Sequence, residues 1–342
     1  MDTTEILNAI KGKDEETKSE YSNDNFDYEE FIEYLKGDIS PNSIVQYSRY
    51  LHQVDFELTE RNIENFQKVA KKQAKRRFGK SEEERNSRNR FIYNLYLAVD
   101  KYLKATDRKN LAEKLPDSSQ LKKPKSRPQK IRYSEDQVNK IMDTADERKT
   151  KLSIALMFYS GLRTYEVLHL TPEWLEFKED RIEVEIPSKY AKGRKSNPRS
   201  EKAYLQTEYE DELQSYIKDC YNYEGSYQQL YQKLETQGSF RHVFRQKEER
   251  NNHFLDIAEE RHIFNKKLEK AARKAGINEA DKISAHKLRK SFIHHVYDKI
   301  QDLNRTAHLA RHRNPQVTAR NYLKLNEQKK LEDYQKVFSQ EQ

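Results

Sequence analysis

The sequence contains a single cysteine, Cys220, among its 342 residues. One thiol cannot form an intramolecular disulfide, and it excludes zinc sites built from several cysteines. No apolar run approaches the roughly 18 residues that a membrane-spanning helix needs. The acidic N-terminus also lacks the charge order of a secretory signal peptide. We therefore expect a soluble protein of the cell interior.

Hydrophobic residues are also scarce, at 35% of the chain against 36% charged residues. The 22 tyrosines and 14 phenylalanines compensate, because aromatic side chains bury large areas. The chain is long enough for two domains with separate cores, and it contains no low-complexity segment. Lysine and arginine exceed aspartate and glutamate by 65 to 57, and this net charge of +8 favours a polyanionic partner without identifying one.

The first part of the chain is predicted to be a small helical domain at residues 25–115, after a polar, mobile leader at residues 1–24. Apolar residues recur at helical spacing over residues 28–35. Ser40 and Pro41 then mark the start of a second helix, because serine caps helix N-termini and proline suits the first helical position.

Two further helices are expected in this domain. The one from Lys68 to Arg77 carries six basic residues, which form either a solvated face or a face that contacts DNA. The other opens at residues 81–84 and carries an apolar stripe from Phe91 to Leu103. Residues 116–130 hold three prolines and five basic residues, and predict an extended linker that either follows a DNA backbone or serves as a plain tether.

The second domain is expected at residues 131–326 and should be mainly helical. A capping box at Ser134 to Gln137 opens it, and the apolar stretch at residues 152–159 predicts a buried helix that ends at Gly161. Residues 182–186 alternate as a strand does, and residues 203–205 are the expected partner strand across a turn-rich loop.

A set of cationic and aromatic side chains suggests an anion site in this domain. Arg163 begins a helix after Gly161, and His286 and Arg289 share one helix face because they are three residues apart. His312 follows one amphipathic helix later, and Tyr322 lies ten positions beyond it. No acidic residue is among these candidate positions, so a phosphate is the expected occupant.

These segments resemble the tyrosine recombinase (phage-type integrase) family. The residues are GLRTYE at 161–166 and SAHKLRKSFIHHVYDKIQDLNRTAHLARHRNPQVTARNYLK at 284–324. The family pattern is an arginine in G-L-R-x-x-E, a lysine on a β-hairpin, H-x-x-R, a second histidine and a nucleophilic tyrosine. FIEYLKGDISPNSIVQYSRYLHQVDFELTERNIENF at 31–66 likewise resembles the family's core-binding domain.

The resemblance implies a fold and an activity. The fold would be mainly α, with an N-terminal helical core-binding (SAM-like) domain and an α-rich catalytic domain carrying a small antiparallel sheet, the DNA breaking-rejoining fold. The activity would be site-specific recombination of double-stranded DNA by a homotetramer on synapsed sites, in the host cytoplasm and its nucleoid. A helix at residues 327–342 would be exchanged between protomers; the alternative is that it docks on its own domain.

The resemblance also implies catalytic roles. Tyr322 would attack phosphorus and hold a 3′-phosphotyrosyl bond, without ATP, metal or cofactor. Arg163 and Arg289 would hold the phosphate, and His286 and His312 would donate hydrogen bonds to it and help remove the tyrosine proton. Tyr297 and Tyr334 are interpreted as a packing residue and a tail residue. Glu166 is interpreted as a residue that orients a neighbour.

The general acid is less well defined. Lys189 directly follows the strand at residues 182–186 and is our choice, whereas Lys192 and Lys195 fall within the loop and are alternatives. Ala310-Arg311 also replaces the family's usual Leu-Gly, and the gap from His312 to Tyr322 is one residue longer than is common. The departures suggest a divergent member, such as one from an archaeal virus or mobile element, and raise the question of whether Arg311 or Arg313 enters the site.

Two other functions share this sequence pattern. A type IB topoisomerase-like or telomere-resolving enzyme would use the same residues without a synaptic tetramer. An architectural DNA-binding protein would keep the fold without chemistry, but the complete residue set argues against it. A metal nuclease is disfavoured because no carboxylate cluster accompanies the motifs.

Overall fold

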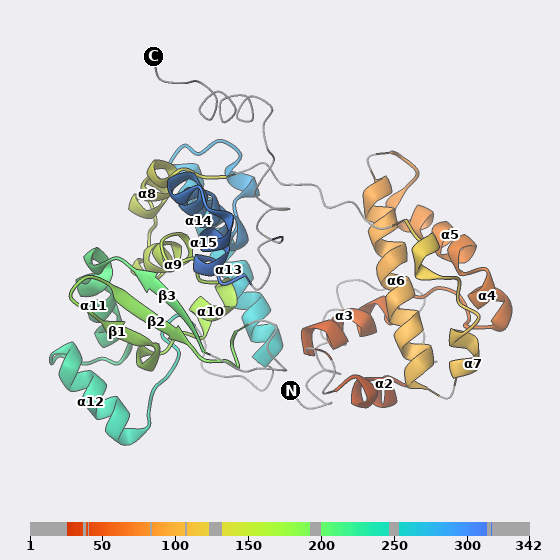
Figure 1. Cartoon of the computed structure of the whole chain (residues 1–342), viewed down its shortest axis with the longest axis horizontal. Coiled ribbons are helices and arrows are strands. Elements are labelled where there is room, and N and C mark those ends of the chain that lie inside the picture. Colours follow the sequence, from red (N-terminus) through yellow and green to blue (C-terminus); the bar gives the residue numbers. More distant parts are fainter. Residues whose placement is uncertain are drawn as a thin grey trace, which may run out of the picture. The chain divides into compact units, whose positions relative to one another are not determined.

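The structure is a computed structural model. It describes residues 26–36, 39, 41–82, 84–106, 108–122, 132–191, 200–245, 253–312 and 316. These residues form two compact units, one from residues 26–122 and one from residues 132–245 and 256–312, which are considered separately (Figure 1). The predicted leader and the predicted C-terminal helix lie outside the described residues.

The first unit is entirely helical in the part that is described. Its elements are α2 (Tyr28–Leu35), α3 (Pro41–His52), α4 (Glu60–Glu64), α5 (Phe66–Phe78), α6 (Arg85–Ala105), α7 (Lys109–Ala112) and the short 3₁₀ helix η1 (Ser118–Gln120). The long helix α6 packs against α3, α5, α2 and α7 (Figure 1). Its predicted apolar stripe is buried, which confirms this part of the sequence analysis; the residues are Phe91, Leu95, Val99, Tyr102 and Leu103.

The helix boundaries in this unit agree with the sequence at α3 and differ at α6. Helix α3 begins at Pro41, as predicted. Helix α6 begins at Arg85, four residues after the expected opening at Ser81. The Ser81 hydroxyl accepts a hydrogen bond from the backbone N–H of Glu84 at 3.4 Å, so it closes a separate turn before the helix starts.

The basic helix α5 has two distinct faces. Phe66, Ala70 and Ala74 are buried in the core of the first unit. The predicted basic residues are all exposed on the other face; they are Lys68, Lys71, Lys72, Lys75, Arg76 and Arg77. Their exposure is confirmed, whereas their contact with DNA stays a prediction.

The beginning of the predicted linker is folded onto the first unit. Asp117 accepts a hydrogen bond from the backbone N–H of Ser119 at 2.7 Å and caps η1. Leu121 is only 6% exposed and belongs to the same core as Leu115. The prediction of an extended segment is therefore wrong for residues 116–122, because two leucines anchor them, and residues 123–130 lie outside the described part of the chain.

The second unit combines helices with one small sheet. Its elements are α8 (Glu135–Asp143), α9 (Arg148–Phe158), α10 (Thr164–Leu168), η2 (Pro172–Trp174), β1 (Leu175–Phe177), β2 (Ile182–Ile186), β3 (Glu201–Leu205), η3 (Thr207–Tyr209), α11 (Glu210–Cys220), α12 (Tyr227–Gln237), α13 (His253–Lys274), η4 (Ala280–Lys282), α14 (Ala285–Ile300) and α15 (Leu303–Leu309). The strands are antiparallel in the order β1-β2-β3. Mainly helical architecture with a small antiparallel sheet is thus confirmed.

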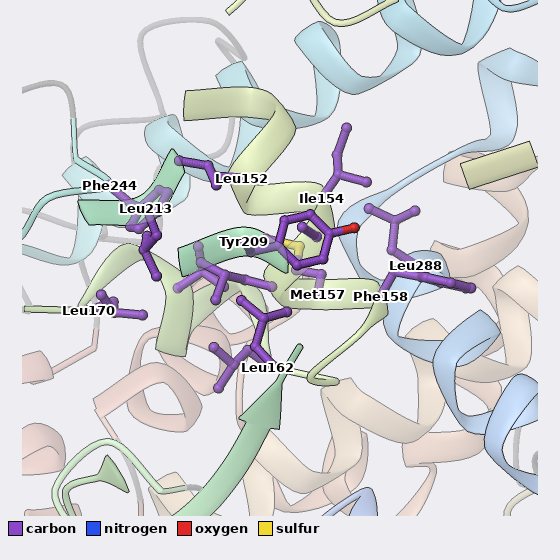
Figure 2. Packing of buried hydrophobic residues seen from close by; sticks show 14 of the residues in the cluster. Leu152, Ile154, Met157, Phe158, Leu162, Leu170, Tyr209, Leu213, Phe244 and Leu288 are labelled. Atoms are coloured by element: carbon purple, nitrogen blue, oxygen red, sulfur yellow. The ribbon is translucent and has the colours of Figure 1, made fainter. Parts of the chain in front are cut away.

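Helix α9 forms the centre of this unit. Every residue from Leu152 to Phe158 is buried, as the sequence predicted. Figure 2 shows Leu152, Ile154, Met157 and Phe158 of α9 surrounded by side chains from other elements, among them Leu213 and Leu288. Helix α9 packs against α8, α10, α11 and α14. It therefore fixes the turn at Gly161 beside α14, which carries the H-x-x-R motif.

The hairpin of β2 and β3 has the predicted pairing, with Val184 opposite Ala203. Glu183 departs from the expected alternation, because it is only 7% exposed. Its carboxylate accepts hydrogen bonds from Arg181 at 2.7 Å and from Lys202 at 2.8 Å, and these partners offset the cost of its burial. No described helix is long and apolar enough to cross a membrane.

Gly161 should not tolerate a side chain. Its φ is +62°, and a Cβ placed there would overlap the ring of Phe292 on α14. We expect Gly161→Ala to lower the free energy of unfolding by about 1 to 3 kcal/mol, through overpacking and left-handed strain together. Chemical denaturation would measure this, with Gly238→Ala as the control for left-handed strain alone, since nothing lies near a Cβ at Gly238. Equal losses for both variants would contradict the overpacking.

Candidate active site

Arg163 lies at the first turn of α10 and is held there by Glu166. The backbone N–H of Arg163 donates to Oε2 of Glu166 at 2.7 Å, and its Nη1 donates to Oε1 at 2.5 Å. Its Nη2 donates to the carbonyl of Arg311 at 3.3 Å. The Arg163 side chain is 23% exposed, so it is oriented by these contacts and still accessible to a ligand. The interpretation of Glu166 as an orienting residue agrees with this geometry.

Arg289 approaches the same point from α14. It is 4% exposed, and it donates to the carbonyl of Gly161 from Nη1 and to the carbonyl of Ala310 from Nη2. These two bonds join the turn before α10 to the end of α15. His286, one helical turn earlier on α14, is exposed.

His312 lies directly after α15, where its backbone N–H donates to the carbonyl of Ala307 at 2.8 Å. Burial, reinforced by the charges of Arg289 and Arg163, lowers the pKa of its ring to about 4. Arg311 and His286 contribute to the same lowering. The structure thus brings Arg163, His286, Arg289 and His312 together, although they are spread over about 150 positions of the sequence.

A cavity of about 500 Å³ opens beside this group. It is lined by His312 and Arg311, by Phe292 of α14 and by the first residues of β3. Tyr322, the predicted nucleophile, lies outside the described residues, so its role stays a prediction.

Lys189 is on the turn that follows β2 and is exposed. Its Nζ lies 4.9 Å from the centre of the Tyr190 ring, and that ring packs against Trp174 and His169. Within the described part of the chain, Lys189 makes no hydrogen bond or ion pair with Arg163, Arg289 or His312. Lys192 and Lys195 lie outside the described residues, so the choice among the three lysines stays open.

Two further charged residues belong to the site. Arg311 enters it, with a side chain that is 4% exposed and an Nη2 that donates to Oε2 of Glu166 at 2.6 Å. Glu201, at the start of β3, lies 3.4 Å from Nε of Arg311 and 3.8 Å from Nη1 of Arg163. The open question about Arg311 is therefore answered, whereas Arg313 lies outside the described residues.

The sequence had led us to expect a purely cationic site, and this expectation is wrong because Glu166 and Glu201 belong to the site. Glu166 is fully buried, and burial by itself opposes its ionisation. The guanidiniums of Arg311, Arg163 and Arg289 outweigh that effect and hold the pKa of Glu166 below its ordinary value. Glu201 was missed by the sequence analysis, although it continues the inward-facing alternation of Ala203 and Leu205. Within the described ranges, no group of histidine, cysteine and acidic residues is placed to hold a metal ion.

The low pKa of His312 has a measurable consequence. We expect its ring to stay neutral down to about pH 4, because burial and three guanidiniums disfavour the imidazolium. Between this value and the ordinary histidine pKa, the unfolded chain binds a proton that the folded chain does not. This residue therefore makes the protein less stable as the pH falls through that interval.

Titration of ¹³C-labelled histidines by NMR would test the prediction, with the His312 signal assigned from His312→Gln. Exposed His308 on α15 is the internal comparison. A His312 midpoint at the ordinary histidine value would contradict the described environment.

Comparisons with known proteins identify what the chain is similar to. The family model described as the phage integrase family matches residues 132–329. A pre-cleavage complex of the XerH site-specific recombinase with difH substrate has a TM-score of 0.53 at 15% identity, covering 99% of this chain and 96% of that chain.

Two other solved structures are similar to the same extent. A Tn1549 transposon integrase in complex with a circular intermediate DNA has a TM-score of 0.55 at 14% identity, covering 91% of this chain and 98% of that chain. A lambda integrase dimer bound to a COC′ core site has a TM-score of 0.51 at 13% identity, covering 86% of this chain and 93% of that chain. No curated protein matches the chain in sequence.

Proposed function

Because this chain belongs to the phage integrase family and is a recombinase enzyme, we propose that it performs site-specific recombination through a tyrosine-linked DNA intermediate. The observation that carries this proposal is the convergence of Arg163 from α10, Arg289 from α14 and His312 from the end of α15. Residues 25–115 would bind DNA as a core-binding domain, with residues 116–122 folded onto it. Residues 123–130 would connect the domains along the DNA, and residues 131–326 would carry out catalysis.

The two arginines suit a phosphodiester. A guanidinium is permanently charged and presents its donors in a planar fork that matches two phosphate oxygens. Arg163 is fixed by Glu166, and Arg289 is fixed by two backbone carbonyls, so neither needs to reorganise when charge develops on the phosphate oxygens.

Tyr322 would supply the nucleophile. Its phenolic oxygen attacks phosphorus, the tyrosine loses its proton, and the bond from phosphorus to the 5′-oxygen breaks. The 3′-phosphotyrosyl bond replaces the bond that was broken, so the strand can be rejoined by the reverse reaction without ATP. Religation to a different 5′-hydroxyl end exchanges the strands.

His312 would act as a proton acceptor whose strength depends on the substrate. Burial and the cations around it hold the pKa of its ring at about 4, so the ring is neutral and weakly basic. A bound phosphate offsets the field of Arg163 and Arg289, which raises the proton affinity of the ring. His286 would donate a hydrogen bond to the same phosphate.

The general acid would be Lys189 or Lys192, which protonates the leaving 5′-oxygen. We expect Lys189→Ala to slow cleavage of ordinary DNA and to cleave normally when a 5′-bridging sulfur replaces that oxygen, since a thiolate leaves without protonation. Lys178→Ala, which removes a lysine next to β1 whose side chain is 38% exposed, is the matched control and should have no effect. Rescue of Lys192→Ala alone would transfer the role to Lys192.

The assembly on DNA would be a homotetramer, with the helix at residues 327–342 passed between protomers. A strand-transfer assay on two duplexes that carry the protein's binding site would test recombination in EDTA and without ATP. Recombinant strands would support the proposal. Relaxation of supercoiled DNA with no recombinant product would favour the type IB topoisomerase-like alternative instead.

A further inference from the structure

Helix α15 ends in a backbone turn that usually contains glycine. The N–H of Arg311 donates to the carbonyl of His308 at 2.9 Å, and the N–H of His312 donates to that of Ala307 at 2.8 Å. This pair of bonds defines a Schellman motif. It places Arg311 in the left-handed region, with φ at +54°. Helix α13 ends with the same pair of bonds, but there the left-handed residue is Gly276.

An arginine at this position is strained, because its Cβ crowds the backbone. The side chain makes a compensating set of contacts inside the site. Its Nη2 donates to Glu166 at 2.6 Å and to the carbonyl of Gly161 at 3.1 Å, and its Nη1 donates to the carbonyl of Ser160 at 3.3 Å. Its Nε lies 3.4 Å from Oε2 of Glu201. Arg311 therefore links the end of α15 to α10, to the turn after α9 and to β3.

These contacts decide how much positive charge Arg163 can offer to a ligand. Nη1 of Arg163 lies 2.5 Å from Glu166 and 3.8 Å from Glu201, so two carboxylates compete for one guanidinium. Arg311 binds the same two carboxylates and draws part of their charge away from Arg163. Among the described residues of the site, three guanidiniums and two carboxylates leave one net positive charge, which Arg311 supplies.

We propose that Arg311 is a positioning residue that engages Glu166 and Glu201, so that the charge of Arg163 remains available to the scissile phosphate. The inference rests on the proposed function, because it takes the phosphate as the ligand of Arg163. In this chain an arginine occupies the left-handed position of the Schellman motif, where glycine is usual, and its charge balances the two carboxylates.

Inorganic phosphate is the probe that tests this inference without DNA chemistry. Binding to the full chain would be followed by NMR at the ring of His312, because that ring reports on the site and not on the exposed basic surface. We expect Arg311→Gly to weaken phosphate binding by about tenfold, through the loss of one nearby positive charge, even though glycine relieves the backbone strain. Exposed Arg305 on α15 provides the control, and Arg305→Gln should bind phosphate like the unmodified protein.

The carboxylate variants separate charge balance from a merely structural role. Glu201→Gln should bind phosphate more tightly, and Arg311→Gly combined with Glu201→Gln should recover to within about threefold of the unmodified protein. Unchanged phosphate binding by Arg311→Gly, or a double variant no better than the single one, would overturn the proposal. If Arg311→Gly fails to fold in thermal melting, unchanged or weaker binding by Glu201→Gln alone would overturn it.

The proposed function can fail independently of this inference. A protein that shows the expected phosphate series but forms no covalent adduct with DNA would retain the role of Arg311 and lose the recombinase mechanism. If the protein forms the adduct but all the variants bind phosphate equally, the recombinase mechanism would stand and the role of Arg311 would be lost.

Discussion

Replacing Tyr322 by phenylalanine should abolish the covalent protein–DNA adduct while leaving DNA binding and thermal stability unchanged. The substitution removes one hydroxyl and nothing else, so only the bond to phosphorus is lost. Adduct formation on labelled DNA would be measured after denaturation, beside a gel-shift assay of binding. Loss of any other catalytic group would lower the rate of cleavage, whereas loss of the nucleophile would abolish the reaction.

Two other tyrosines provide matched controls for this experiment. Tyr297→Phe removes a hydroxyl from α14, and Tyr334→Phe removes one from the segment after Tyr322. Both variants should form adduct at the normal rate. Full cleavage by Tyr322→Phe would remove the proposed mechanism.

Arg289→Lys should lower the cleavage rate by about a hundredfold or more, as Arg289→Ala and Arg163→Ala should, because the loss of one preorganised donor typically costs about 3 kcal/mol of barrier. Lysine keeps the charge but offers a point donor in place of a planar fork. Arg289 uses Nη1 for Gly161 and Nη2 for Ala310, and one ammonium cannot reproduce this geometry while contacting a phosphate.

Single-turnover cleavage rates would measure this effect, with Arg273→Lys as the control. Arg273 is exposed on α13 and pairs with Glu269 at 2.6 Å, so its replacement should leave the rate unchanged. Near-normal cleavage by Arg289→Lys would show that charge alone suffices at this position and would contradict the role assigned to the fork.

Much of the fold follows from local patterns in the sequence. The capping box of Ser134 and Gln137, the buried stretch of α9 and the strand β2 each depend on neighbouring residues, and each is confirmed, although Glu183 breaks the alternation of β2. The three-residue strand β1 was missed because so short a segment shows no reliable alternation. Helices α11 and α12 were also not predicted, although both are amphipathic.

The site was predictable only in part, for a physical reason. The types and order of Arg163, His286, Arg289 and His312 could be predicted because they match the pattern of the family that the sequence resembles. The positions of Arg311 and Glu201 in the site depend on contacts between α10, β3 and the end of α15. Glu166 and Arg311, which form one of these contacts, are more than 100 residues apart in the sequence. Tertiary contacts of this kind leave no periodic signal in the sequence.

The most direct test of the mechanism is to trap the full-length protein on a nicked suicide duplex, selected from a random pool by binding, and to sequence the DNA-linked peptide by mass spectrometry. Once a strand is cleaved beside a nick, the short 5′-hydroxyl fragment diffuses away and religation cannot occur. We expect a 3′-phosphate linked to Tyr322, formed equally well in the presence of EDTA. A linkage to any other residue, or the absence of an adduct on DNA that the protein binds, would contradict the central claim.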